Sequence, residues 1–338
     1  MQYSAAAIVA LSAAPAVADC VNANHIVEPG ETVFTISEGY YGALEQWSLI
    51  FYSNPGKLSN PLEIPAGTQL TIPCPTDGSD FIADATPLQV DDAEMILVTG
   101  SNYAPFTDRR WPGQGMITEL VNAAMEETPN PVTYAIKWED DWSKHLFPML
   151  DQKEADMGFP WFRPDCEQMP SNERCANFHF SDPIVELLQL LFVVNGSGLT
   201  FEQDSDLHGK ALCRPAGYFT FDLDSEERQW LTEELVTLVQ PATPTDCFDL
   251  LVRGDVDAVA LNEFTGWTTV SDMGLRNAIA PLPTPLGLQG LHVVISKRHW
   301  RGTTHLYRFN AGLAKLKESA RYDEIVSRHL GVFWDRVN

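Results

Sequence analysis

The sequence predicts an α/β fold that is preceded by a small unit of two strands and two helices. From residue 94 onward, short apolar runs typical of buried strands alternate with segments that carry apolar residues at helical spacing. Strands that alternate with helices in this way form a mostly parallel sheet. Residues 24–73 have a different order, in which a strand, two helices and a second strand follow one another.

The charge of the chain limits its partners. Its 338 residues include 22 basic and 46 acidic side chains, for a net charge of −24. A protein this acidic repels nucleic acid backbones and anionic lipid head groups, so neither is an expected partner. The same charge opposes self-association, and we expect a soluble monomer.

The amino-terminal segment predicts export. Residues 1–18 carry no charge and end in Ala16-Val17-Ala18, which is typical of a secretory signal peptide and its cleavage site, although the usual basic residue near the start is missing. No later stretch approaches the ~18 consecutive apolar residues that span a membrane. The expected location is therefore the periplasm.

Because exported proteins enter an oxidising compartment, the six cysteines predict three disulfides. No cysteine or histidine spacing fits a zinc site, and no cofactor is expected. Six cysteines allow fifteen pairings, which the sequence alone does not resolve. Spacing favours Cys20 with Cys74, Cys166 with Cys175, and Cys213 with Cys247.

The small unit resembles a LysM domain. The resemblance rests on three pieces in the expected order, which are Val27-x-Pro29-Gly30-Glu31-Thr32, then Asn54-Pro55, and finally Pro65-Ala66-Gly67-x-x-Leu70-x-Ile72-Pro73. We place this domain at residues 20–74, with its second helix at about 44–52. The resemblance implies binding of N-acetylglucosamine-containing glycans such as peptidoglycan, through loops 30–35 and 54–60. The alternative is a structural module with weak glycan affinity.

Residues 75–93 read as an extended, self-repelling linker. They show little hydrophobic periodicity and contain five aspartates at positions 77, 80, 84, 91 and 92. The linker separates the small unit from residues 94–338.

The larger unit resembles the type II solute-binding proteins of bacterial ABC importers, within the polar amino acid family. The matching pieces occur in the family's order over residues 94–331. They are Gly100-Ser101-Asn102-Tyr103-Ala104-Pro105-Phe106-Thr107, Gly115-Met116, Trp138, Leu150-x-x-x-x-Ala155-Asp156, Phe180-Ser181-Asp182-Pro183, Asp206-Leu207-x-Gly209-Lys210, Leu251-x-x-Gly254-x-x-Asp257-Ala258 and Tyr322-x-x-Ile325-x-x-x-x-Leu330-Gly331.

This resemblance implies a bilobed periplasmic-binding-protein type II fold, with two α/β lobes joined by a two-strand hinge. We expect lobe 1 at residues 94–190 and 295–338, and lobe 2 at 195–290. The hinge strands would be Leu187–Val194 and Leu291–Ser296, and the ligand would lie between the lobes.

Aromatic residues at strand ends are the first candidates for the ligand site. A small solute that leaves water needs apolar walls and a few fixed polar groups. Tyr103 and Phe106 lie on a turn after a strand, where the family places stacking rings, and Trp138 and Trp161 also follow strands. Open α/β sheets bind ligands at the carboxyl ends of strands, so these positions favour the cleft over core packing.

Two arginines are candidates to bind a ligand carboxylate, because Arg pairs with carboxylates in a bidentate geometry. Arg174 stands six residues before Phe180, as the family's cleft arginine does, but the family's threonine before it is missing. Arg163 directly follows the strand that contains Trp161, and we favour it slightly. The alternative for both is a surface ion pair.

The second lobe departs from the family's amino acid site. The position at which the family holds an α-amino group with Asp is Asn262 here. The Gly-Ser/Thr pair that supplies backbone N–H groups is replaced by Gly217-Tyr218, and Phe219 follows. We therefore expect Tyr218, Phe219 and Asn262 to form an aromatic, weakly charged wall for a ligand other than an ordinary α-amino acid.

The overall prediction is a non-enzymatic binding protein. The sequence has no nucleophile elbow, HExxH motif, phosphate loop or dinucleotide fingerprint. We expect it to capture a small polar, amino-acid-like solute for an ABC permease and to associate with peptidoglycan through the LysM-like unit. The alternatives are a muropeptide-binding or sensory envelope protein without transport, and a dehydratase-like enzyme on the same fold.

Overall fold

The computed structural model describes residues 22–42, 46–58, 60–74 and 93–337. The predicted signal peptide, Cys20 and nearly all of the predicted linker lie outside these residues. Within them, no helix is both long and apolar enough to cross a membrane.

A ten-stranded sheet forms the centre of the larger unit. Along the sheet the strands are β4 (Tyr134–Trp138), β3 (Met95–Thr99), β5 (Met157–Phe162), β12 (Gly287–Ser296), β7 (Val185–Val194), β10 (Ala258–Asn262), β8 (Ala211–Cys213) and β9 (Thr237–Val239), with β6 (Phe178–Phe180) beside β12 and β11 (Ile279–Pro281) beside β7. Parallel pairs lie toward both ends of the sheet, as the alternation of strands and helices predicted. Every pair that β7 or β12 forms is antiparallel, so the sheet is mixed and the prediction of a mostly parallel sheet was wrong.

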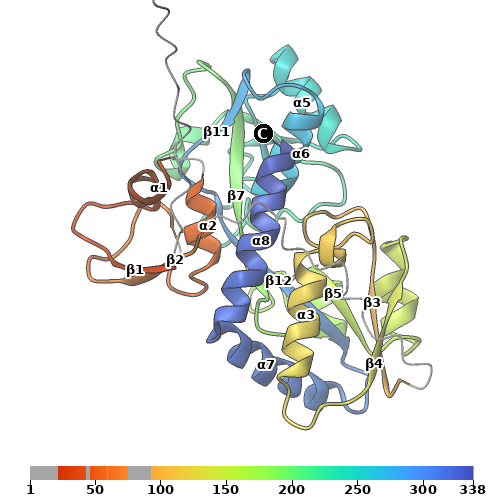
Figure 1. Cartoon of the computed structure of the whole chain (residues 1–338). Coiled ribbons are helices and arrows are strands. Elements are labelled where there is room, and N and C mark those ends of the chain that lie inside the picture. The colour runs from red at the N-terminus through yellow and green to blue at the C-terminus, as the bar shows by residue number, and fades with distance from the viewer. Residues whose placement is uncertain (1–21, 43–45, 59, 75–92, 338) are drawn as a thin grey trace, which may run out of the picture.

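The two longest strands, β7 and β12, join the two halves of the sheet. They pair antiparallel, from Gly287 opposite Gln189 to Leu291 opposite Val185. On one side β12 pairs with β5, and on the other β7 pairs with β10. We call the half that contains β3, β4 and β5 lobe 1, and the half that contains β8, β9 and β10 lobe 2 (Figure 1). The segments expected as hinge strands fall within β7 and β12.

Helices cover both lobes. The longer ones are α3 (Met116–Glu126) and α7 (Gly302–Lys317) on lobe 1, α5 (Pro244–Arg253) and α6 (Glu263–Asp272) on lobe 2, and the last helix, α8 (Ala320–Val337). Shorter helical segments are α4 (Glu173–Asn177), η2 (Pro112–Gln114), η3 (His145–Leu150) and η4 (Asp204–Leu207). Local chemistry sets the bounds of α5, because Thr243 and Asp246 form a capping box at its start and Gly254 ends it in a left-handed conformation.

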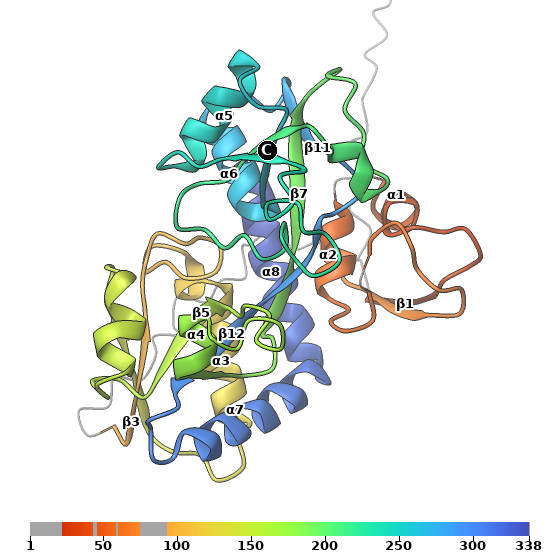
Figure 2. The same cartoon turned by 180° about the vertical axis from the view of Figure 1, so that it is seen from behind.

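Helix α8 extends over both lobes. It packs on α3 and α7 in lobe 1 and on α6 in lobe 2 (Figures 1 and 2). At its end, the Ser271 hydroxyl of α6 donates to the Val337 carbonyl. The sequence placed this helix wholly with lobe 1, whereas its carboxyl end lies against lobe 2.

The amino-terminal unit has the predicted βααβ order. Strands β1 (Ala23–Ile26) and β2 (Gln69–Ile72) pair antiparallel, and α1 (Val33–Tyr41) and α2 (Trp47–Tyr52) lie between them in the chain. Thr32 caps α1 and Gly42 ends it. Beyond this order and pairing, the structure does not identify the unit as a LysM domain.

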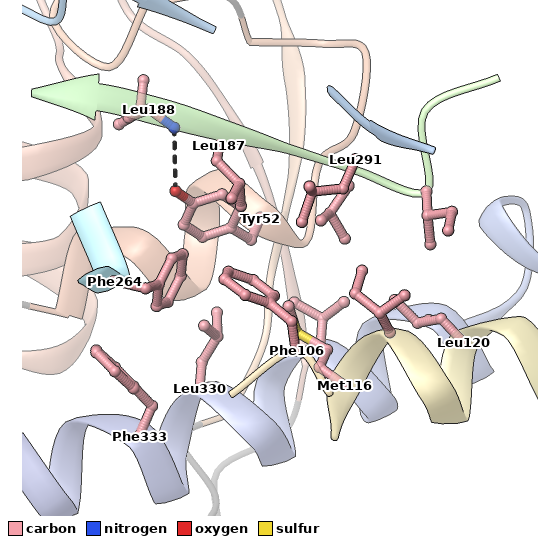
Figure 3. Packing of buried hydrophobic residues seen from close by; sticks show 14 of the residues in the cluster. Tyr52, Phe106, Met116, Leu120, Leu187, Leu188, Phe264, Leu291, Leu330 and Phe333 are labelled. Atoms are coloured by element: carbon pink, nitrogen blue, oxygen red, sulfur yellow. Dashed lines mark hydrogen bonds between the residues drawn. The ribbon is translucent and has the colours of Figure 1, made fainter. Parts of the chain in front are cut away.

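The unit packs directly on the larger unit rather than standing apart. Tyr52 of α2 lies in the same apolar cluster as β7, α6 and α8, as Figure 3 shows. Its ring is 5.4 Å from that of Phe264, and its hydroxyl donates to Glu263 Oε2 at 2.8 Å. At the far end of α8, Trp334 Nε1 donates to Ser48 Oγ at 2.7 Å. The two units therefore share one hydrophobic core.

Candidate inter-lobe ligand site

A pocket of about 310 Å³ lies between the lobes at the carboxyl ends of the strands. Its lobe 1 wall consists of Asn102, Tyr103, Trp142, Pro160, Trp161, Phe162 and Arg174. Its lobe 2 wall consists of Gly217, Tyr218, Phe219, Asn262 and Thr265. Parallel strands end at the same edge of a sheet, which is why segments that follow β3, β5, β8 and β10 meet here.

The lobe 1 wall is aromatic. The Trp142 ring lies 6.2 Å from that of Tyr103 and 6.0 Å from that of Trp161, in edge-on contacts. Trp142 is fixed in place because its Nε1 donates to the Ser101 carbonyl at 3.2 Å. Trp161 Nε1 is buried and has no hydrogen-bond partner among the described residues.

Arg174 is the charged residue of the pocket. Its guanidinium lies 5.1 Å from the Trp161 ring, and its Nη1 donates to the Phe162 carbonyl at 3.4 Å. No carboxylate within the described part of the chain forms an ion pair with it. Burial lowers the pKa of Arg174, but a guanidinium stays protonated at neutral pH. The side chain therefore offers charged donors to an anion.

A buried arginine holds the lobe 2 wall. Arg214 is only 1% exposed, and both of its terminal nitrogens bond to Asp222. The same guanidinium donates to the Phe219 carbonyl at 2.8 Å and to the Ala260 carbonyl at 3.0 Å. It also lies 5.1 Å from the Phe219 ring. Arg214 thus fixes the loop that carries Tyr218 and Phe219 relative to β10.

The polar groups of lobe 2 are used mostly within the protein. Asn262 Oδ1 accepts from the Thr265 amide at 3.0 Å and caps α6, while Nδ2 donates to Thr265 Oγ1 at 2.9 Å. Across the pocket, burial raises the pKa of Tyr103, and the nearby Tyr218 phenol raises it further. No Asp or Glu of the described residues lines this pocket. The site therefore presents one cation, uncharged polar groups and aromatic surface.

The structure brings most of the predicted site residues together. Tyr103, Trp161, Arg174, Tyr218, Phe219 and Asn262 all line the pocket.

Three predicted site residues lie elsewhere. Phe106 is fully buried and packs behind Tyr103, with ring centres 4.9 Å apart. Trp138 lies under Arg109, whose guanidinium is 5.5 Å from its ring. Arg163 is exposed and lines a separate cavity of about 850 Å³ between the lobes. Of the two arginines, only Arg174 therefore reaches this pocket.

Sequence reasoning missed Trp142 and Arg214. Trp142 lies on the loop after β4, just before the helical segment η3, which starts at His145. Arg214 follows β8 directly, and its position at a strand end was the one available signal. Arg214 can be buried because it forms an ion pair with Asp222, and nothing in the sequence indicates that pair.

Two disulfides match the predicted pairs. Cys166 bonds to Cys175, next to Arg174, and Cys213 of β8 bonds to Cys247 of α5. The predicted Cys20–Cys74 pair includes a residue outside the described part of the chain and stays a prediction.

Comparisons with known proteins identify the fold. No protein-family model matches the sequence, and no curated protein matches it. Among solved structures, a histidine kinase sensor domain with similarity to periplasmic binding proteins aligns with 21% identity and a TM-score of 0.51, over 72% of this chain and 98% of that one.

Two further structures agree. A mutant of ArgBP from T. maritima aligns with 22% identity and a TM-score of 0.50, over 70% of this chain and 94% of that one. The VFT2 domain of BvgS from Bordetella pertussis aligns with 16% identity and a TM-score of 0.50, over 70% and 91%. The chain thus has an α/β fold like that of the periplasmic binding proteins.

Proposed function

We propose that this protein is a solute-binding protein that captures a small organic carboxylate with an apolar body between its lobes. The observation that carries the proposal is Arg174, a cation without an ion-pair partner in the described chain, set against Trp161 in a pocket whose walls come from both lobes. An ordinary α-amino acid also needs an anion for its ammonium group, and the pocket walls hold none. The solute is therefore a relative of amino acids that lacks a free α-ammonium group.

The fold and the disulfides support the proposed location and partner. Disulfides persist in oxidising compartments, so the two observed pairs support a periplasmic location. There the loaded protein would deliver its solute to an ABC permease in the inner membrane.

A sensory role is the second candidate. One of the solved structures of similar fold is described as a histidine kinase sensor domain. Deleting the gene separates the two roles. If the protein is an importer component, the deletion abolishes uptake of the identified solute. If it is a sensor, the deletion leaves uptake intact and changes gene expression.

The decisive experiment uses three matched ligands and two arginine variants. Isothermal titration calorimetry is run with phenylacetate, phenylalanine and phenethylamine. We expect phenylacetate to bind best, and Arg174→Ala to weaken it by about 10–100-fold, the value of about one charge-assisted hydrogen bond. Arg163→Ala is the control, because Arg163 lines another cavity, and it keeps wild-type affinity. Equal losses in both variants, or a preference for the amine, would contradict the proposal.

Peptidoglycan association is a separate part of the proposal and depends on the LysM resemblance. Of the two predicted glycan loops, residues 54–58 face β7 and α8 across a small cavity, and Asn54 is buried. Loop 30–35 is therefore the main candidate for glycan contact. Sedimentation of the full chain with purified peptidoglycan, compared with Glu31→Ala and Thr35→Ala variants, tests it. If the wild type does not sediment with peptidoglycan, the proposed association with the cell wall is wrong, whereas the proposal of solute binding is unaffected.

A further inference from the structure

A second cavity, of about 240 Å³, lies where the amino-terminal unit meets lobe 2 and α8. It is distinct from the inter-lobe pocket, with which it shares no lining residue. We call it the junction cavity. Its walls come from the amino-terminal unit, from lobe 2 and from the end of α8. Lobe 2 contributes the hinge strand β7, helix α6 and residues of the segment 276–283.

The walls of the junction cavity are mainly apolar and include four aromatic rings. Trp47 and Phe34 of the amino-terminal unit contact each other with ring centres 5.2 Å apart. Opposite them, Trp267 and Trp334 lie edge-on at 6.4 Å. Leu188 of β7 also lines the cavity. Such walls favour a flat, apolar body, which makes offset or edge-on contacts with the rings.

One polar group on the wall lacks a partner. Glu263 is 1% exposed, and its Oε2 accepts from the Tyr52 hydroxyl. Its Oε1 is buried and has no hydrogen-bond partner among the described residues. Burial raises the pKa of Glu263 to about 8, so the carboxyl is protonated at neutral pH. A protonated carboxyl both donates and accepts, so it can bond a hydroxyl group of either orientation.

Charge excludes a cationic occupant. Arg276 lines the same cavity, and its guanidinium lies 5.2 Å from the Trp267 ring. With Glu263 uncharged, a cationic occupant would meet Arg276 and no carboxylate among the described lining residues. The walls therefore disfavour a cationic occupant.

We propose that the junction cavity is a second small-molecule site, which takes an uncharged aromatic alcohol whose hydroxyl bonds to the Glu263 carboxyl. The site does not depend on the function proposed for the inter-lobe pocket.

The test uses the full chain, labelled with ¹⁵N at its tryptophan indoles, and p-cresol as the probe. Binding at the junction cavity shifts the indole signals of Trp47, Trp267 and Trp334, whereas binding between the lobes shifts those of Trp142 and Trp161. At pH 7 we expect p-cresol to shift the signals of Trp47, Trp267 and Trp334. We expect p-cresol to bind about tenfold more tightly than toluene, which corresponds to about one net hydrogen bond. We expect no binding of 4-methylbenzylamine.

Variants assign the site independently of the spectra. Leu282→Trp places a large ring in the cavity and abolishes p-cresol binding, whereas Arg174→Ala in the other pocket leaves it unchanged. The double variant Tyr52→Phe/Glu263→Met removes both polar partners at similar volume and equalises p-cresol and toluene. Absence of p-cresol binding, shifts confined to Trp142 and Trp161, or tighter binding of the amine would each overturn the proposal.

Discussion

At the scale of single residues, Arg214 links stability to the shape of the inter-lobe pocket. Its guanidinium bonds to Asp222 and to the Phe219 carbonyl while being almost inaccessible to water. Replacing one partner of a buried ion pair leaves the other charge unpaired in the interior. We predict that Arg214→Met lowers the free energy of unfolding by about 3–5 kcal/mol and also weakens ligand binding.

The double variant Arg214→Met/Asp222→Leu is the control for this prediction. It removes both charges together and leaves no unpaired charge in the interior, so it recovers most of the lost stability. Urea unfolding of the three proteins measures the difference. If Arg214→Met is as stable as the wild type, another group must compensate the charge of Asp222, and the prediction is wrong.

Glu263 predicts a pH dependence of stability. Its pKa is raised from 4.5 to about 8 in the folded protein by burial, against the opposing effect of the Tyr52 hydrogen bond. Between these values the folded state keeps a proton that the unfolded state has lost, so stability falls as the pH rises. We predict that the free energy of unfolding falls by on the order of 1 kcal/mol per pH unit between these two pKa values.

The variant Glu263→Gln isolates this contribution, because it keeps the shape and cannot ionise. Urea midpoints at pH 5, 7 and 9 should fall more steeply for the wild type than for the variant. Arg276, which lines the same cavity, is unchanged in both proteins. Parallel curves would mean that Glu263 does not titrate in this range.

At the scale of elements, α7 and α3 approach each other closely at a glycine. A Cβ on Gly312 would lie 2.2 Å from the Ala124 carbonyl oxygen and 3.0 Å from the Thr128 amide. These are backbone atoms, so Gly312→Ala forces the helices apart. We predict that Gly312→Ala lowers the free energy of unfolding by about 1–3 kcal/mol, which a lower melting temperature would show.

Gly39 in α1 is the matched control. A Cβ there meets no atom within 4 Å. Gly39→Ala gains only helix propensity and stabilises the protein by about 0.5–1 kcal/mol. Opposite signs for two Gly→Ala changes within helices would establish that contact, rather than propensity, decides the effect at Gly312.

Elements with local signals could be predicted from the sequence, and elements shaped by tertiary contacts could not. Thr243-Pro244 and Gly254 mark both ends of α5, and the long apolar runs of β7 and β12 were recognised as hinge strands. The helical segment η3 is irregular in its middle, because Pro148 lacks an amide hydrogen and Phe147 before it adopts an extended backbone. The position of α8 across both lobes depends on contacts far apart in the sequence.

At the scale of the whole molecule, the inter-lobe pocket was largely predictable because strand ends converge at one edge of the sheet. The choice between Arg163 and Arg174 was not predictable, because the family spacing pointed to Arg174 whereas the position directly after β5 favoured Arg163. Which of them reaches the pocket depends on the loop that the Cys166–Cys175 disulfide closes. The junction with the amino-terminal unit was not predictable. Tyr52 and Glu263 are 211 residues apart, and the acidic stretch between the units indicated separation.

The shared core predicts that the amino-terminal unit and the lobes unfold together. Tyr52 connects them through its contact with Phe264 and its bond to Glu263. Tyr52→Ala opens a cavity there and leaves Glu263 with one partner fewer, so we predict a loss of about 3–5 kcal/mol. Tyr40→Ala is the control, because Tyr40 is 45% exposed on the same unit. Calorimetry should show one transition that moves to lower temperature only for Tyr52→Ala, whereas independent units would give a main transition that neither change affects.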